Sequence, residues 1–160
     1  MADDILIRKA KLDDFENIHK IFLQVHELHL NSRKDIFKDN TDPMNYNDFK
    51  DGLLNTEKLY FVAELKSNIV GICLCSIKIV EDNKYLKYRK ILYINDICVD
   101  KKFRNQGIGK KMYEKVFQKA KELKCNSVEL MVWGFNKNAI RFYKSLGMKV
   151  KNMKFEQFVD

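Results

Sequence analysis

Residues 104–110 read Arg-Asn-Gln-Gly-Ile-Gly-Lys and stand between two segments of different hydrophobic period. The preceding residues 88–99 are rich in Ile, Leu and Tyr and predict a strand. From Ile108 onward, apolar residues recur at intervals of three and four, which predicts an amphipathic helix. Glycines at positions 107 and 109 let the backbone approach a ligand closely. The segment therefore predicts a loop that holds an anion, most naturally a pyrophosphate, at a helix N-terminus.

Two common phosphate loops do not fit this segment. A Walker A loop needs Gly-x-x-x-x-Gly-Lys-Ser/Thr, which residues 102–111 do not provide. A dinucleotide fingerprint needs a third glycine where Met112 stands. A plain strand-to-helix turn stays open as the alternative. Positive charge around the loop favours the anion site, and it comes from Lys101, Lys102, Arg104, Lys110 and Lys111.

The elements around the loop alternate between strand and helix periods. Further strands are expected at residues 5–8, 59–65, 69–80, 127–133, 148–150 and 155–159. Helices are expected at residues 12–29, 46–54, 108–123 and 136–146. The strand–helix–strand unit in the middle implies a parallel pair in a mixed sheet. We find no repeat or linker and expect a single domain over residues 1–160.

The chain carries a net charge of +8, and this excess is unevenly distributed. Residues 1–80 hold 11 Lys/Arg and 13 Asp/Glu, whereas residues 81–160 hold 19 and 9. A basic half suggests a polyanionic partner such as nucleic acid, a membrane surface or a phosphate-bearing cofactor. Because Lys supplies 25 of the 30 basic residues, a compositional bias toward Lys is the alternative.

The cysteine pattern and the lack of a long apolar run indicate the cellular compartment. Cys73 and Cys75 form Cys-x-Cys within an apolar run, which is no disulfide framework. The acidic start, Met-Ala-Asp-Asp, has no signal-type apolar stretch, and no run of about 18 apolar residues predicts a membrane span. We expect a reduced cytoplasmic protein without membrane association.

Three motifs in the correct order carry a family resemblance. Residues 104–109 have the spacing Arg/Gln-x-x-Gly-x-Gly/Ala, which resembles the acetyl-CoA loop of the GNAT superfamily of N-acetyltransferases. Residues 136–148 read Asn-x-x-Ala-x-x-Phe-Tyr-x-x-Leu-Gly-Met and resemble the family's C-terminal motif, with Met148 replacing the usual aromatic residue. Residues 93–99, Tyr-Ile-Asn-Asp-Ile-Cys-Val, resemble its bulged fourth strand.

The resemblance implies a fold and a co-substrate. The implied fold is α/β, with a mostly antiparallel sheet of six to seven strands and helices on both faces. A central parallel pair would splay to admit acetyl-CoA. The residues implied in binding acetyl-CoA are Ile97, Cys98, Val99, Arg104, Asn105, Gln106, Gly107, Ile108, Gly109, Lys110, Asn136 and Tyr143.

The same resemblance implies catalytic roles for two residues. Tyr143 is expected to protonate the departing thiolate, since a phenol with a pKa of about 10 is protonated at neutral pH. Asp96 is the first candidate for the general base and Glu129 the second. Spermidine/spermine acetyltransferases carry Glu-Asp where this chain has Asn95-Asp96, which weakens a polyamine interpretation. Structural carboxylates are the alternative for both acids.

The acceptor site is the least defined part of the sequence. Histidines at positions 26 and 29 are three apart, whereas the zinc motif His-Glu-x-x-His places them four apart, so we expect no metal. The residues expected to line the acceptor site are His26, His29, Arg33, Asn95 and Glu129. Buried helix-face histidines are the alternative.

The expected function is transfer of an acetyl group from acetyl-CoA to a primary amine of a small molecule, peptide or protein. Acetylation of a ribosomal protein or an aminoacyl-tRNA stays open, as does a non-catalytic module that binds acyl-CoA or RNA. Nucleic acid is not the expected partner, because no aromatic-interleaved binding motif is present. The sequence leaves open the acceptor, a longer acyl donor, and a monomer or homodimer.

Overall fold

The computed structural model describes residues 4–159, so residues 1–3 and 160, the ends of the predicted domain, lie outside the described part. In residues 4–159 the strands are β1 (Ile5–Lys9), β2 (Lys58–Leu65), β3 (Asn68–Val80), β4 (Arg89–Val99) and β5 (Ser127–Leu130). The α-helices are α1 (Phe15–Ser32), α2 (Tyr46–Leu54), α3 (Ile108–Glu122) and α4 (Lys137–Ser145). Short 3-10 turns, Leu12–Asp14 and Lys101–Phe103, precede α1 and follow β4. Of the described helices, none combines the length and hydropathy that a bilayer span requires.

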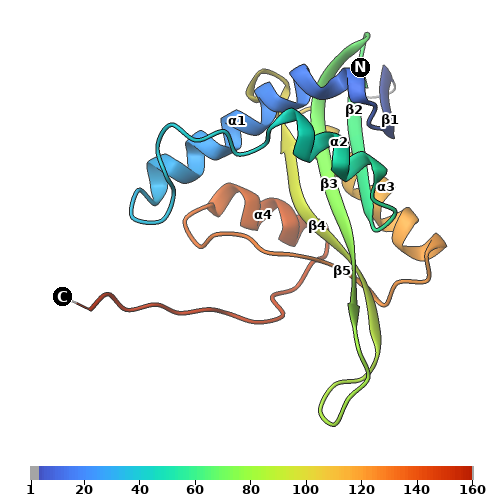
Figure 1. Cartoon of the computed structure of the whole chain (residues 1–160), viewed down its shortest axis with the longest axis vertical. Helices are drawn as coiled ribbons and strands as arrows, with labels where there is room; N and C mark the ends of the chain where they lie inside the picture. The colour runs from blue at the N-terminus through green and yellow to red at the C-terminus, as the bar shows by residue number, and fades with distance from the viewer. Residues whose placement is uncertain (1–3, 160) are drawn as a thin grey trace.

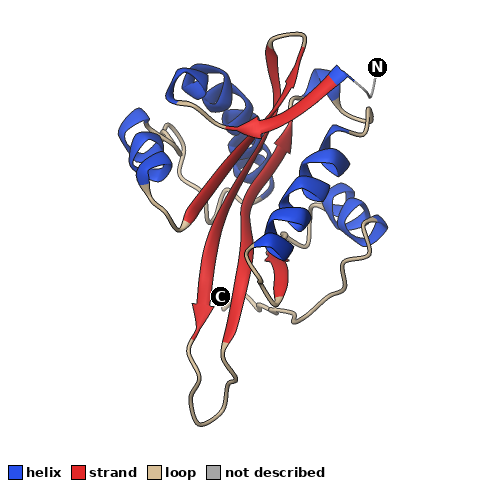
Figure 2. Ribbon diagram, turned by 90° about the vertical axis from the view of Figure 1, so that its right-hand side faces the viewer, coloured by secondary structure: helices blue, strands red, loops and turns tan. Residues whose placement is uncertain are grey.

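The five strands form one mixed sheet in the order β1-β2-β3-β4-β5 (Figure 1). All neighbours are antiparallel except β4 and β5, which the crossover through α3 makes parallel. The longest strands, β3 and β4, extend beyond the rest of the sheet and end in a loop (Figure 2). The predicted α/β class with a mixed sheet is confirmed.

Helices cover both faces of the sheet and close two apolar cores. On one face α3 contributes the fully buried Ile108, Met112 and Val116, as its period predicts. On the other face α1 and α2 contribute Ile18, Ile21 and Phe49 to a separate core. All four cysteines are free, and Cys125 alone among them is half-buried instead of buried.

An ion cluster fixes the start of α1 against the sheet. Arg8 on β1 donates two hydrogen bonds of 2.8 Å to the carboxylate of Asp14 and one of 2.7 Å to Glu64 on β2. Asp14 also accepts a bond of 2.7 Å from the backbone N–H of Lys11. Asp14 is buried, so this pairing is what makes its charge tolerable there.

The C-terminal strands predicted at residues 148–150 and 155–159 are wrong. Residues 148–159 form neither helix nor strand, and from residue 149 onward every described side chain is exposed. Figure 1 shows this segment, which we call the C-terminal arm (residues 149–159), running below α4, and Glu156 pairs with Arg33 at the end of α1. The described sheet therefore has five strands instead of six to seven. The parallel pair lies at one edge of it because β5 has no strand beyond it.

Candidate active site

The parallel pair β4–β5 separates halfway along β4. The pairing runs from Ile91 opposite Ser127 to Ile94 opposite Leu130 and ends there. Beyond this point β4 pairs only with β3 among the described residues. Its register shifts between Leu74 and Cys75, which leaves Asn95 as a bulge in β4. Residues 95–99 thus present backbone groups toward a gap, as the resemblance to a bulged strand predicts.

The loop after β4 ends in a left-handed glycine that starts α3. Gly107 is the N-cap of α3 with φ of 79°, and Asn105 has φ of 62°. No side chain caps α3 at this end, so the first N–H groups remain available. Ile108 is buried and anchors the helix, which leaves only its backbone for a ligand.

These features fit a diphosphate. The free N–H groups and the positive end of the α3 dipole favour an anion, and the loop is exposed. Arg104 is held beside the loop by a bond of 3.1 Å from its Nε to the carbonyl of Val99. Lys110 is also exposed, and its Nζ lies 3.9 Å from Glu114. The residues present can therefore hold the charged end of acetyl-CoA.

The helix α4 packs beside this loop and carries Tyr143. A Cβ at Gly109 would meet Cζ of Phe142 at 3.0 Å, so this glycine lets α4 approach α3 closely. Asn136, expected to contact the co-substrate, accepts a bond of 3.1 Å from the N–H of Ala139 and caps α4. Its carbonyl oxygen thus has a structural function, which the capping preference of Asn explains.

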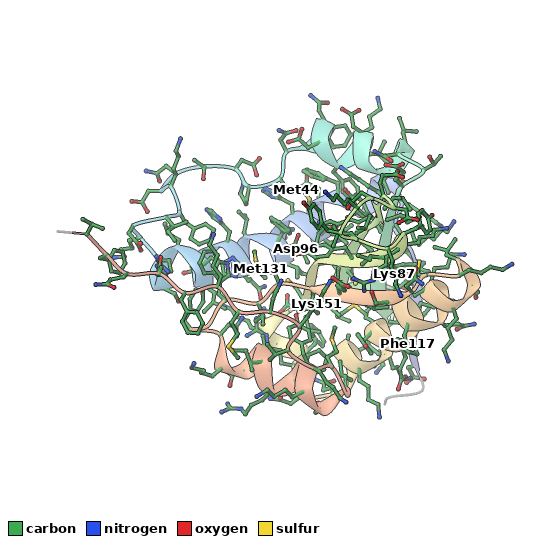
Figure 3. All side chains as sticks on the ribbon, turned by 90° about the horizontal axis from the view of Figure 1, so that it is seen from below. Met44, Lys87, Asp96, Phe117, Met131 and Lys151 are labelled. Atoms are coloured by element: carbon green, nitrogen blue, oxygen red, sulfur yellow. The ribbon has the colours of Figure 1, made fainter. Side chains whose placement is uncertain are left out.

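An open cavity of about 290 Å³ lies on the other side of β4, between the sheet and the α1–α2 face. Asp96 and the bulged Asn95 contribute to its wall, and Figure 3 labels Asp96 and Met44, which also lines it. Asn95 accepts a bond of 2.8 Å from Ser76 on β3. The lining residues are Phe22, Pro43, Met44, Asp48, Phe49, Lys58, Tyr60, Leu74, Ser76, Asn95 and Asp96.

Burial gives Asp96 the proton affinity of a general base. It raises the pKa of the Asp96 carboxyl to about 7, because the charged form loses hydration. A group with this pKa exchanges protons efficiently near neutral pH. Burial and the charge of Asp96 also raise the pKa of Tyr60.

The charge of Asp96 affects the pKa of Tyr143, so the two side chains lie within electrostatic reach of each other. Burial raises the pKa of the Tyr143 phenol well above its usual value, and Cys98, Cys73 and Asp96 add to the effect. Burial likewise raises the pKa of Cys98, whose side chain is part of the core. Cys98 could thus serve a ligand only through its backbone, whereas Tyr143 stays protonated and can donate its proton.

His26, His29 and Arg33 do not line the cavity beside Asp96. They lie near the C-terminal end of α1, where His29 stacks on Phe37 at 5.3 Å. The guanidinium of Arg33 lies 5.6 Å from the Trp133 ring. Burial, with a smaller effect of His26, lowers the pKa of His29, so this histidine favours its neutral form. The structure thus places these three residues in an aromatic cluster.

Glu129 makes ion pairs that leave it poorly suited as a base. It accepts bonds of 2.8 Å from Arg89 and 2.9 Å from both Ser127 and Lys151. These bonds outweigh its desolvation and lower its pKa. Of the two carboxylates that the sequence suggested as bases, the structure favours Asp96.

Of the cavity-wall residues, only Asn95 and Asp96 were expected from the sequence; the other nine were not, and Phe22, Met44, Asp48 and Tyr60 are among them. Phe22 belongs to the apolar stripe of α1, and Tyr60 to a strand pattern. Both read as ordinary core positions. Met44 and Asp48 follow a polar loop without a motif. No local signal in the sequence could have grouped them.

Comparison with known proteins gives a consistent family. The sequence profile of the acetyltransferase (GNAT) family matches residues 12–148. An uncharacterised N-acetyltransferase of Methanocaldococcus jannaschii is 34% identical over 105 residues, which are 66% of this chain and 45% of that protein. The thialysine N-epsilon-acetyltransferase of Sus scrofa is 40% identical over 58 residues, 36% of this chain and 34% of that protein. The matched stretches thus span less than half the length of these two relatives.

A solved structure resembles the whole fold. It is a mutant of the BH1408 protein from Bacillus halodurans, which aligns with a TM-score of 0.94 at 30% identity. The alignment covers 96% of this chain and 99% of that chain. The likeness therefore extends over almost the whole of both chains.

Proposed function

Because this chain belongs to the acetyltransferase (GNAT) family, we propose that it transfers an acetyl group from acetyl-CoA to a primary amine. The observation that carries this proposal is the gap between β4 and β5, with Asp96 and Tyr143 within electrostatic reach of each other beside it. The anion-binding loop at Gly107 lies at the end of the same strand. Strand β4 thus carries Asp96 and leads into the loop for the phosphates, and Tyr143 reaches the same place from α4.

The reaction is a direct attack on the thioester. The amine nitrogen forms a bond to the acetyl carbon and the carbon–sulfur bond breaks. Asp96 takes the proton that the amine loses, for which its pKa of about 7 suits it. Tyr143 gives its hydroxyl proton to the departing thiolate, and solvent then restores both groups. Backbone groups of residues 97–99 hold the pantetheine arm and polarise the thioester carbonyl.

The acceptor that we propose is a small cationic amine. The cavity beside Asp96 is small, and two of its wall residues are the carboxylates Asp48 and Asp96, against a single Lys58. The aromatic rings of Phe22 and Tyr60 offer faces that attract an ammonium group. The similarity to a thialysine N-epsilon-acetyltransferase supports an amine at the end of an aliphatic chain.

The test is release of free CoA from acetyl-CoA with a panel of amines, measured through the new thiol. The panel contains thialysine, lysine, spermidine, a peptide with a free N-terminus and an aminoacyl-tRNA. We expect turnover with thialysine and lysine, whose amines lie at the end of an aliphatic chain. Turnover only with the peptide or the tRNA would contradict the acceptor class, and binding of CoA without turnover on any amine would contradict the enzyme.

A Tyr143→Phe variant tests the proton donor. We expect kcat to fall by about 100-fold, since general acid catalysis contributes roughly 10²–10⁴, while the affinity for CoA measured by calorimetry stays within about twofold. The matched control is Phe142→Leu, the neighbouring α4 ring 5.4 Å away, which carries no transferable proton. An unchanged kcat in Tyr143→Phe would show that another group protonates the thiolate.

A further inference from the structure

The loop that joins β3 to β4 exposes two aromatic rings at the tip of the longest extension of the sheet (Figure 2). The two strands pair as far as Val80 opposite Arg89, and residues 81–88, which we call the tip loop, are all exposed. Tyr85 is 86% exposed and Tyr88 is 53% exposed. Rings placed in this way add little to the core, so they are available to a partner.

The tip loop is held by hydrogen bonds of its own. The side-chain oxygen of Asn83 accepts bonds of 2.9 Å from the N–H of Tyr85 and 3.0 Å from the N–H of Leu86. The N–H of Asn83 donates a bond of 2.9 Å to the carbonyl of Leu86. The rings are therefore presented on a closed turn, and a partner that binds them has less chain to order.

Basic and aromatic residues alternate along this segment. Residues 84–90 read Lys-Tyr-Leu-Lys-Tyr-Arg-Lys. In residues 4–159, neither Lys84 nor Lys87 forms an ion pair, whereas Arg89 is held by Glu129 at 2.8 Å. The sequence prediction divided this segment between a turn and the start of a strand at Tyr88, which separated its members, so no aromatic-interleaved motif was recognised.

The positive charge continues beside the stem of the hairpin. The N–H of Lys90 donates a bond of 2.8 Å to the side chain of Asn126, whose own N–H donates one of 2.7 Å to the carbonyl of Lys90. These bonds place the loop between α3 and β5, with the exposed Lys124, next to β4. The cations of this surface are Lys84, Lys87, Lys90 and Lys124, and the acids in the tip loop are Glu81 and Asp82.

We propose that residues 84–90 bind a single-stranded nucleic acid. Tyr85 and Tyr88 stack on unpaired bases, and the lysines on either side of them contact the phosphates. This pairing of ring with base and cation with phosphate is how proteins hold single strands without regard to sequence. An anionic membrane fits less well, because Leu86 is the one aliphatic residue among residues 81–88. The proposal does not depend on acetyl transfer. Figure 3 labels Lys87 of the tip loop and, separately, Asp96 of the cavity.

The first experiment measures binding of the full chain to fluorescent RNA and DNA single strands by anisotropy. We expect a Kd of about 1–100 µM for oligonucleotides of about 12 nucleotides at about 100 mM salt. A duplex should bind more weakly, because its bases stack on each other. Tyr85→Ala with Tyr88→Ala should weaken binding by at least about 10-fold. Tyr85→Phe with Tyr88→Phe keeps the rings and should bind like the parent. A duplex bound as tightly as a single strand would contradict the stacking.

The second experiment tests the lysines through the salt dependence of the same binding. Each phosphate contact contributes about 0.7 to the slope of log K against log salt, so Lys84→Gln with Lys87→Gln should reduce it by about 1.4. Lys34→Gln with Lys38→Gln, at two exposed lysines after α1, is the matched control and should leave the slope unchanged. Near-UV circular dichroism checks that every variant folds.

Three outcomes would overturn the proposal. The first is a parent chain that binds neither RNA nor DNA single strands. The second is binding that neither the tyrosine nor the lysine variants change, since another surface would then hold the strand. The third is binding to vesicles that contain phosphatidylserine without binding to oligonucleotides, which would make the tip loop a membrane contact.

Discussion

At the scale of single residues, the half-buried Asp96 combines a raised pKa with a lack of stabilising partners. Its carboxyl lies in the wall of an open cavity beside apolar, aromatic and polar side chains, and among the described residues no hydrogen bond or ion pair to it is found. Asp14, the buried acid at the start of α1, instead receives three hydrogen bonds from Arg8 and Lys11. A half-buried carboxylate that loses hydration without gaining a partner opposes folding, and catalysis is a physical reason to retain one.

The pH dependence of catalysis follows from the raised pKa of Asp96. A base must be deprotonated, so kcat/KM should lose one additional factor of ten per pH unit below about pH 7. Asp96→Asn should lower kcat/KM by about 100-fold and remove this inflection. Loss of the proton from the acceptor amine, with a pKa of about 10, gives a separate slope in both proteins. Asp48→Asn, in the same cavity, serves as control and should keep the inflection.

The ionised Asp96 carboxyl should destabilise the folded chain, and the direction of this pH dependence follows from its raised pKa. The folded chain holds the Asp96 proton up to about pH 7, whereas the unfolded chain loses it near 3.8, so rising pH between these values favours unfolding. At pH 8 Asp96→Asn should therefore raise the free energy of unfolding by about 2–4 kcal/mol. At pH 5 the gain should be smaller by about 2 kcal/mol. Urea unfolding of the wild type and of Asp96→Asn at both pH values measures the gain in the free energy of unfolding. Equal gains at the two pH values would contradict the assigned pKa.

At the scale of elements, the sequence predicts those helices, strands and loops whose signals lie in neighbouring residues. The loop at residues 104–110 and the helix after it follow from two glycines and a change of period, and both are present. The cavity beside Asp96 could not be predicted, because Phe22, Met44 and Tyr60 come from three distant segments whose patterns are those of an ordinary core. The C-terminal strands failed for another reason: composition favours a strand, but a strand also requires a partner.

The junction of β1 with the turn before α1 should depend on Asp14. Replacing it by Ala leaves the guanidinium of Arg8 with Glu64 as its one carboxylate partner among the described residues and should lower the free energy of unfolding by about 3 kcal/mol. Asp13→Ala changes the exposed neighbour and should remain within about 0.5 kcal/mol of the parent. Because Arg8 lowers the pKa of Asp14, its contribution is present at neutral pH and is lost as pH falls below the usual range of a carboxyl. Urea titrations of both variants measure these changes in the free energy of unfolding.

At the scale of the whole molecule, the net charge of +8 is unequally divided between the two halves of the chain. The basic second half contains the loop before α3, where the phosphates of acetyl-CoA would sit. The slightly acidic first half contributes Asp48 to the cavity proposed for the amine. Strand β4 connects these two regions, because it carries Asp96 in the cavity wall and leads into the loop before α3.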